Sequence, residues 1–87
     1  MSNDIDVRRR KALFRAAHRG TKEMDWMLGR FAAAQLGTMD NDQLAAFERL
    51  IAAADPEIQA WLMDPGTCNQ AEFLHLIDQI RRYNNLS

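Results

Sequence analysis

The stretch Arg19-Gly20-Thr21-Lys22-Glu23-Met24-Asp25 lies between two amphipathic segments and packs four charges around one glycine. Gly20 predicts a helix stop, because glycine enters the left-handed conformation that ends many helices without a Cβ penalty. Thr21 can then cap a second helix, and Glu23 in its first turn faces the positive end of the helix dipole. The stretch therefore predicts a tight corner between two helices.

The segments on either side of this corner have helical periodicity. The first runs from Asp6 to about His18, and its apolar positions are Val7, Leu13, Phe14 and Ala17. The second runs from about Lys22 to Gln35, and its apolar face is Met24, Met27, Leu28, Phe31 and Ala34. Trp26 falls on nearly the opposite face, where an indole is either covered by another helix or exposed for a partner. In a small bundle the covered position is the more common one, but the sequence leaves both open and Trp26 stays a candidate for partner binding.

Three shorter helices are predicted after a break at Gly37 and Thr38. Asp40 followed by Gln43 has the pattern of a capping box, and Asn69 with Glu72 repeats it before the last helix. Between them, Asp55 suits an N-cap and Pro56 the first helical position, where its missing N–H costs nothing. The predicted core positions of these helices are Leu44, Phe47, Leu50, Ile51, Ala54, Ile58, Trp61, Leu62, Phe73, Leu76, Ile77 and Ile80.

Length and composition favour a single globular domain. The chain has 87 residues, of which 47% are hydrophobic, and only two are prolines. No alternating run bounded by turn residues predicts a strand. We therefore expect an all-α fold, a small bundle of about five short helices spanning residues 1–87, with frayed ends at 1–5 and 84–87.

The residues argue against an enzyme. The chain has no glycine-rich phosphate loop, G-x-S-x-G elbow or H-E-x-x-H helix. One cysteine, Cys68, and two histidines, His18 and His75, cannot form a disulfide and are too few for a typical zinc site. Glu23 and Asp25 are two positions apart on a helix and point away from each other, so they cannot act on one substrate atom. A binding module with no cofactor or metal of its own remains.

Charge is distributed unevenly along the chain. Residues 1–22 hold seven basic and two acidic residues, whereas residues 23–87 hold four basic and ten acidic residues. Such an uneven distribution of charge produces an electric field around the molecule. This field can steer association with an acidic partner surface. The basic run Arg8–Lys11 is typical of a solvated helix face. The alternative is a nucleic-acid-binding or antitoxin-like regulatory protein that uses this run and Arg15, although the run lacks interleaved aromatic residues.

The corner and a later block together resemble a known family. Arg19-Gly20-x-x-Glu23, followed by Phe47-x-x-Leu50-Ile51, Asp55-Pro56-x-Ile58 and Trp61-Leu62, is similar in order and spacing to the succinate dehydrogenase assembly factors. These are the flavinylation factors of bacteria and mitochondria, and the resemblance covers roughly residues 7 to 82. It implies a five-helix bundle, in agreement with the periodicity.

The resemblance also implies a function. Members of this family bind the flavoprotein subunit of succinate dehydrogenase and, in some bacteria, of fumarate reductase. They promote covalent attachment of FAD to a histidine of that subunit, and so act as assembly chaperones and not as enzymes. The lack of a long N-terminal extension resembles the bacterial type, which implies a cytoplasmic location. We further expect a monomer without membrane insertion or nucleic-acid binding.

Carried over to this chain, the motif places Arg19, Gly20 and Glu23 in the partner interface. Gly20 would allow close approach of the backbone, and Arg19 would offer its planar set of donors to carboxylates or carbonyls. Glu23 would either orient Arg19 or reach the partner. Neighbouring residues complete the predicted partner-binding set: Arg15, His18, Lys22, Asp25 and Trp26. His18 stands where many members have a second arginine, which predicts a mild pH dependence of binding.

Overall fold

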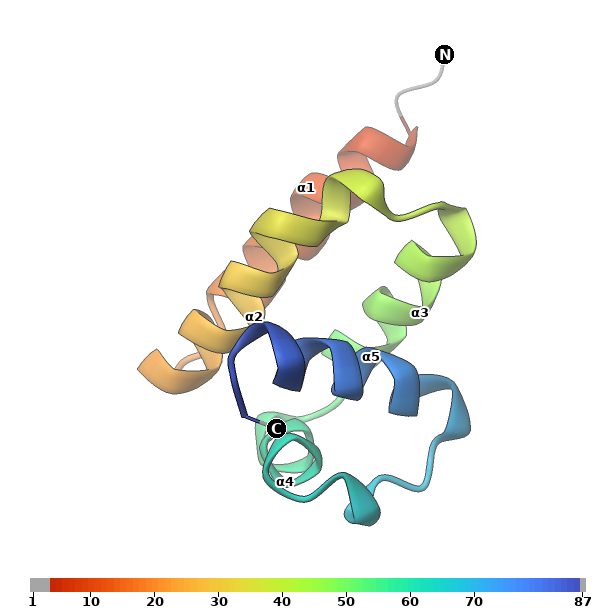
Figure 1. The fold of residues 1–87 in the computed structure, drawn as a ribbon. Coiled ribbons are helices and arrows are strands. Elements are labelled where there is room, and N and C mark those ends of the chain that lie inside the picture. The colour runs from red at the N-terminus through yellow and green to blue at the C-terminus, as the bar shows by residue number, and fades with distance from the viewer. Residues whose placement is uncertain (1–3, 87) are drawn as a thin grey trace.

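The fold was taken from a computed structural model, which describes residues 4–86. It has five α-helices and two short 3₁₀ turns, and no strand occurs within these residues (Figure 1). This confirms the predicted all-α bundle. In chain order the elements are α1 Asp4–Ala17, α2 Lys22–Gln35, η1 Leu36–Thr38, α3 Asn41–Ile51, α4 Asp55–Met63, η2 Pro65–Thr67 and α5 Ala71–Tyr83.

The helices are arranged as a hairpin closed by three shorter helices. α1 and α2 run antiparallel along each other, and α3 packs against α1 (Figure 1). α5 contacts α2, α3 and α4, so the last helix closes the bundle over the core. No helix within residues 4–86 is long and apolar enough to cross a membrane. The corner between α1 and α2 lies at one end of the hairpin. It is next to the α3–α4 connection, because Arg19 of the corner contacts Ile51, Ala53 and Asp55.

The core follows the predicted faces of α2 to α5. Phe31 and Phe47 lie with ring centroids 6.0 Å apart, and Trp61 and Phe73 lie 5.7 Å apart. Two predicted core alanines, Ala34 and Ala54, are exposed. The remaining predicted core residues of these four helices are all buried: Met24, Met27, Leu28, Phe31, Leu44, Phe47, Leu50, Ile51, Ile58, Trp61, Leu62, Phe73, Leu76, Ile77 and Ile80.

The predicted apolar face of α1 was partly wrong. Val7 and Ala17 are half-buried, but Leu13 is 36% exposed and Phe14 is 63% exposed, whereas Ala12 and Ala16 are buried. Ala17 lies close against Gly29 of α2, so a small side chain stands where the two helices meet and the larger residues turn outward. Hydrophobicity alone could not reveal this, because it favours the larger side chains for the buried face.

Two of the predicted caps were wrong as well. The Asp40–Gln43 capping box is present, with both reciprocal hydrogen bonds formed. Asp55, however, is the first residue of α4 and not its N-cap, because its carboxylate is bound to Arg19. Glu72 belongs to no capping box, because α5 begins without a side-chain cap and the Glu72 carboxylate pairs with Arg49 at 2.7 Å. In both cases a distant arginine binds the carboxylate that the local pattern assigned to the helix end.

Both ends of the described chain are better packed than the sequence predicts. α1 begins at Asp4, two residues early, and Ile5 packs against the core. The predicted frayed residues 1–3 and 87 lie outside the described residues. α5 ends at Tyr83, but Asn84 is buried, and its amide donates to the Met27 and Ile80 carbonyls at 3.3 and 2.9 Å. Asn84 thus ties the C-terminal end of α5 to α2.

Candidate functional site

The corner between α1 and α2 has the predicted backbone. α1 ends at Ala17, Gly20 has φ +112°, and Thr21 caps α2 by accepting a hydrogen bond from the Met24 N–H at 3.3 Å. A Cβ added at Gly20 would meet no heavy atom within 4 Å, so the space beside it is open. The positive φ therefore requires glycine here, while the surroundings leave its backbone accessible.

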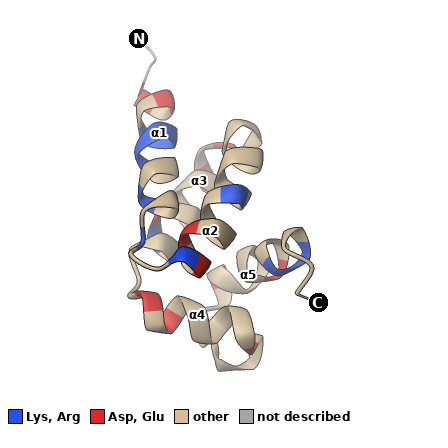
Figure 2. Cartoon of the chain, turned by 90° about the vertical axis from the view of Figure 1, so that its left-hand side faces the viewer, with Lys and Arg blue, Asp and Glu red and all other residues tan. Residues whose placement is uncertain are grey.

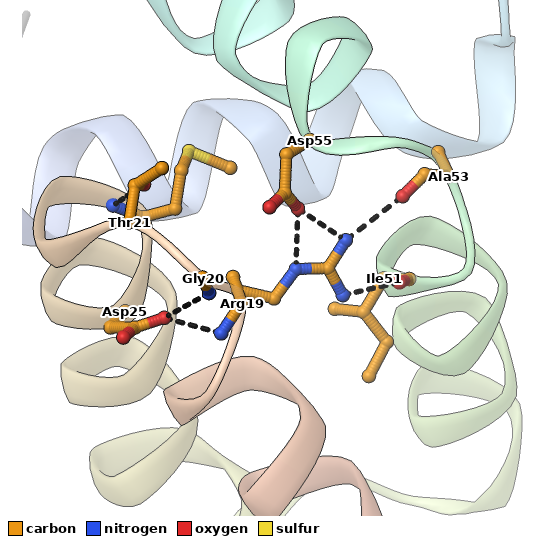
Figure 3. A network of polar contacts seen from close by, with 8 residues as sticks. Arg19, Gly20, Thr21, Asp25, Ile51, Ala53 and Asp55 are labelled. Carbon is orange, nitrogen blue, oxygen red and sulfur yellow. Dashed lines mark hydrogen bonds and ion pairs between the residues drawn. The ribbon is translucent and has the colours of Figure 1, made fainter.

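Asp25 closes the corner from the α2 side. Its Oδ1 accepts hydrogen bonds from the backbone N–H groups of both Arg19 and Gly20, the latter at 3.2 Å (Figure 3). A carboxylate on the first turn of α2 thereby holds the main chain that enters the turn. Asp25 was predicted to be a partner-binding residue. In the structure its carboxylate is engaged within the chain.

The side chain of Arg19 also turns inward. Its Nε donates to Asp55 Oδ1 at 2.7 Å, and the same carboxylate oxygen lies 2.7 Å from Nη2 (Figure 3). Nη1 donates to the Ile51 carbonyl at 2.5 Å and Nη2 to the Ala53 carbonyl at 2.9 Å. The Arg19 side chain is only 11% exposed. The donors expected to face a partner are thus used to bind the α3–α4 connection.

Asp55, Ile51 and Ala53 are the part of this arrangement that sequence reasoning missed. Asp55-Pro56 stood out in the sequence as a helix start, and also as part of the family block. Neither pattern links it to Arg19, which lies 36 residues earlier. Glu23, the predicted alternative partner of Arg19, makes none of the hydrogen bonds or ion pairs of Arg19 within residues 4–86.

Other predicted residues of the corner face outward. Lys22 and Glu23 are exposed, and Trp26 is 56% exposed, so of the two positions left open for the indole it takes the uncovered one. The Arg30 guanidinium lies 4.3 Å from the Trp26 ring centroid and 5.4 Å from that of Tyr83. This cation–π contact holds the indole against α2 without removing it from solvent.

A groove beside the corner connects Glu23 and Trp26 to the end of α4. Its lining is Glu23, Trp26, Met27, Gln59, Met63 and Leu86. Met63 is 56% exposed, so two large apolar side chains from different helices stand in solvent at this groove. Large exposed apolar groups with a polar rim are typical of protein-binding surfaces.

The remaining two predicted residues, Arg15 and His18, lie at the C-terminal end of α1. The His18 ring stacks on Phe14 with centroids 4.1 Å apart, and its Nδ1 is 2.8 Å from the Phe14 carbonyl oxygen. Arg15, His18 and Phe14 are all exposed. The imidazole therefore presents its other edge outward, beside the corner and on the α1 side.

The basic run on α1 is partly used inside the fold. Figure 2 shows Lys and Arg following one another along α1. Arg8 donates to both Glu48 oxygens, at 3.2 and 2.6 Å, and to Asn41 at 2.6 Å, while Arg9 donates to the Met39 carbonyl at 2.8 Å. Through this hydrogen bond Arg8 lowers the pKa of the Glu48 carboxyl, against the opposing effect of burial. Arg8 thus binds α1 to α3, and Arg9 binds it to the connection just before α3, so both side chains are engaged within the fold.

The other residues considered for chemistry, Cys68 and His75, lie on other parts of the fold, after η2 and on α5. Within residues 4–86 no three His, Cys, Asp or Glu residues are placed to hold a metal ion. Cys68 is buried, and its thiol lies 3.6 Å from the Gln70 carbonyl. His75 is exposed and lines a separate hollow between α2, α3 and α5. The corner itself presents an accessible backbone turn flanked by charged and aromatic side chains.

Comparison with known proteins shows which family the chain belongs to. The sequence model of one protein family, described as "Flavinator of succinate dehydrogenase", matches residues 10–84. The chain belongs to this family. The match includes the whole corner and the α3–α4 connection, so both segments bound by Arg19 lie within the family region.

Individual relatives in the flavinator family are bacterial and mitochondrial. An FAD assembly factor SdhE from Acetobacter pasteurianus is 40% identical over 60 residues, covering 69% of this chain and 55% of that protein. Another SdhE, from Acinetobacter baylyi, is 30% identical over 95% of this chain and 96% of its own length. A mitochondrial succinate dehydrogenase assembly factor 2 from Dictyostelium discoideum is 31% identical over 70% of this chain and 43% of its own length. No solved structure matches the chain.

Proposed function

We propose that this chain binds the flavoprotein subunit of succinate dehydrogenase and promotes covalent attachment of FAD to it. The observation that carries this proposal is the match of residues 10–84 to the flavinator family. Relatives aligned over nearly their whole length are named FAD assembly factors. The chain thus acts as an assembly factor, and the bond forms between the flavin and a histidine of the partner.

The corner supplies the contact surface in this proposal. Gly20 offers backbone with open space beside it, and Glu23 and Trp26 stand exposed on the adjoining turn of α2. A surface of this kind can bias its partner if it binds one conformer more tightly than the others. The conformer selected here is one that holds FAD next to the acceptor histidine, so binding raises the rate of attachment without any catalytic group of this chain.

The finer features of the proposal follow from the resemblance. The partners are the succinate dehydrogenase flavoprotein and, in some bacteria, that of fumarate reductase. The chain acts in the cytoplasm as a monomer and carries no cofactor of its own. A nucleic-acid function is less well supported, because Arg8 and Arg9 of the basic run are bound to other parts of the chain.

Co-expression tests this function. The succinate dehydrogenase flavoprotein is produced with and without the chain, denatured, and its gel band is read for flavin fluorescence. Gly20→Arg fills the open space beside the corner, whereas Gly20→Ala adds the strain of a side chain at positive φ with little bulk. We expect fluorescence to rise with the wild-type chain, to persist in part with Gly20→Ala, and to stay at background with Gly20→Arg.

Circular dichroism of the purified variants serves as the control for folding. A folded Gly20→Arg chain that supports no flavinylation places the contact at the corner. Equal fluorescence with and without the wild-type chain would contradict the proposed function.

A further inference from the structure

We infer that Asp55 is a positioning residue of the partner-binding corner, and that Arg19 acts through Asp55 and the α3–α4 connection and not by contacting the partner. The inference rests on the proposed function for its consequence and on the contacts of the free chain for its geometry. It divides the Arg-Gly-x-x-Glu motif into a part that holds the corner, Arg19, and a part that faces outward, Gly20 and Glu23.

The surroundings of the Arg19 guanidinium explain why it stays inside. Ile51 is the last residue of α3, and the carbonyls at a helix C-terminus have no partner within the helix and carry partial negative charge. Within residues 4–86, the hydrogen bonds to the Ile51 and Ala53 carbonyls come from Arg19. Arg19 thus caps α3 from a segment 32 residues away.

Asp55 completes this site from the other helix. It is the first residue of α4, where a carboxylate is favoured by the positive end of the helix dipole. The guanidinium therefore lies between the negative end of one helix and an acid at the positive end of the next. Nε, Nη1 and Nη2 all donate within the chain, so few donors of Arg19 remain for another protein.

The corner is consequently held from two directions. Asp25 binds the backbone N–H groups of Arg19 and Gly20, and Asp55 with the two carbonyls binds the side chain of Arg19. Gly20, between these anchors, keeps its φ of +112° and its open side. We call these two sets of contacts the Arg19 clamp. A surface held in its bound shape loses less conformational entropy on association, so the Arg19 clamp favours partner binding without touching the partner.

The free chain provides the first test. Asp55→Ala removes the carboxylate from Arg19 and leaves the corner sequence unchanged. We expect the ¹H–¹⁵N resonances of Gly20 and Asp25 to shift in this variant with no partner present. Unmoved Gly20 and Asp25 resonances would overturn the inference, whatever the partner proves to be.

Binding to the purified flavoprotein provides the second test. We expect the Kd to rise at least tenfold for Asp55→Ala and similarly for Arg19→Gln. The double variant should be no weaker than the weaker single variant, because both changes release the same clamp. Asp55→Asn keeps an acceptor oxygen, so its Kd should rise less than that of Asp55→Ala. An unchanged Kd for Asp55→Ala together with a raised Kd for Arg19→Gln would show that Arg19 contacts the partner directly.

A matched variant separates positioning from stability. Glu48→Ala removes a different ion pair, in which Arg8 of α1 lies 2.6 Å from the Glu48 carboxylate. This pair lies away from the corner. We expect Glu48→Ala to lower Tm and leave the Kd of the folded protein unchanged, whereas Asp55→Ala raises Kd. Equal changes in Kd for the two variants would show that Asp55 acts only through the stability of the fold and does not position the corner. Failure of the wild-type chain to bind the flavoprotein would contradict the proposed function instead, and the resonance test would still decide on the clamp.

Discussion

Gly29 of α2 lies directly against Ala17 at the end of α1. A Cβ atom at Gly29 would come within 3.1 Å of the Ala17 Cα and 3.2 Å of its Cβ. The two helices thus meet through a glycine and an alanine immediately before the corner, and two further alanines of α1, Ala12 and Ala16, are buried. This close contact sets the distance between the helices that the corner connects.

Enlarging Gly29 should therefore destabilise the chain. For Gly29→Val we expect a loss of about 1–3 kcal/mol in the free energy of unfolding, because overpacking at a tight contact outweighs the small gain in helix propensity. Urea unfolding followed by circular dichroism measures this change. Ala33→Val, at an exposed position of the same helix, is the control and should lower stability only by the difference in helix propensity, about 0.5 kcal/mol. Equal stability of the two variants would contradict the close packing.

Stability should fall in acid partly through Glu48. Its hydrogen bond to Arg8 lowers the pKa of the folded carboxyl below the unfolded value. The stabilisation is therefore complete above the unfolded pKa of about 4.3 and is lost as the pH falls through the folded pKa. Glu48→Gln should lower Tm at pH 7 and approach the wild-type value at pH 3. A Tm difference that stays constant between these two pH values would contradict this assignment.

Trp26 should contribute to binding and little to stability. Its indole is 56% exposed and stacked with Arg30, in the groove that Met63 also lines. If the flavoprotein covers this groove, Trp26→Ala should weaken binding by about tenfold, the scale of an aromatic anchor worth about 1–2 kcal/mol. Leu74→Ala, an exposed apolar residue of α5 outside the groove, is the matched control. Isothermal titration calorimetry measures both affinities for the flavoprotein. Equal affinities of the two variants would contradict a role of the groove in binding.

Local rules predicted the parts of the fold that depend on neighbours in sequence. Gly20, Thr21 and the Asp40–Gln43 box fulfil their predicted roles, because a helix stop or cap is decided within a few residues. The apolar periodicity of α2 to α5 likewise identified most of the core. These signals are sufficient for an all-α bundle and for the position of its first corner.

Long-range contacts decided what local rules could not. Asp55 and Glu72 both match helix-cap patterns, yet each carboxylate binds an arginine from another helix or corner. Neither the Arg19 clamp nor the small-residue contact of α1 has a periodic signal in the sequence. For the same reason the motif identified the corner but not which of its side chains face outward: Arg19 and Asp25 turn in, whereas Glu23 and Trp26 remain exposed.

The central claim is most directly tested by reconstitution from purified components. Flavoprotein subunit that lacks covalent flavin is incubated with free FAD, with or without this chain, and covalent flavin is followed over time by fluorescence of the denatured band. We expect faster attachment with the wild-type chain and a rate near background with folded Gly20→Arg. An identical time course with the wild-type chain, with Gly20→Arg and with no chain at all would contradict it.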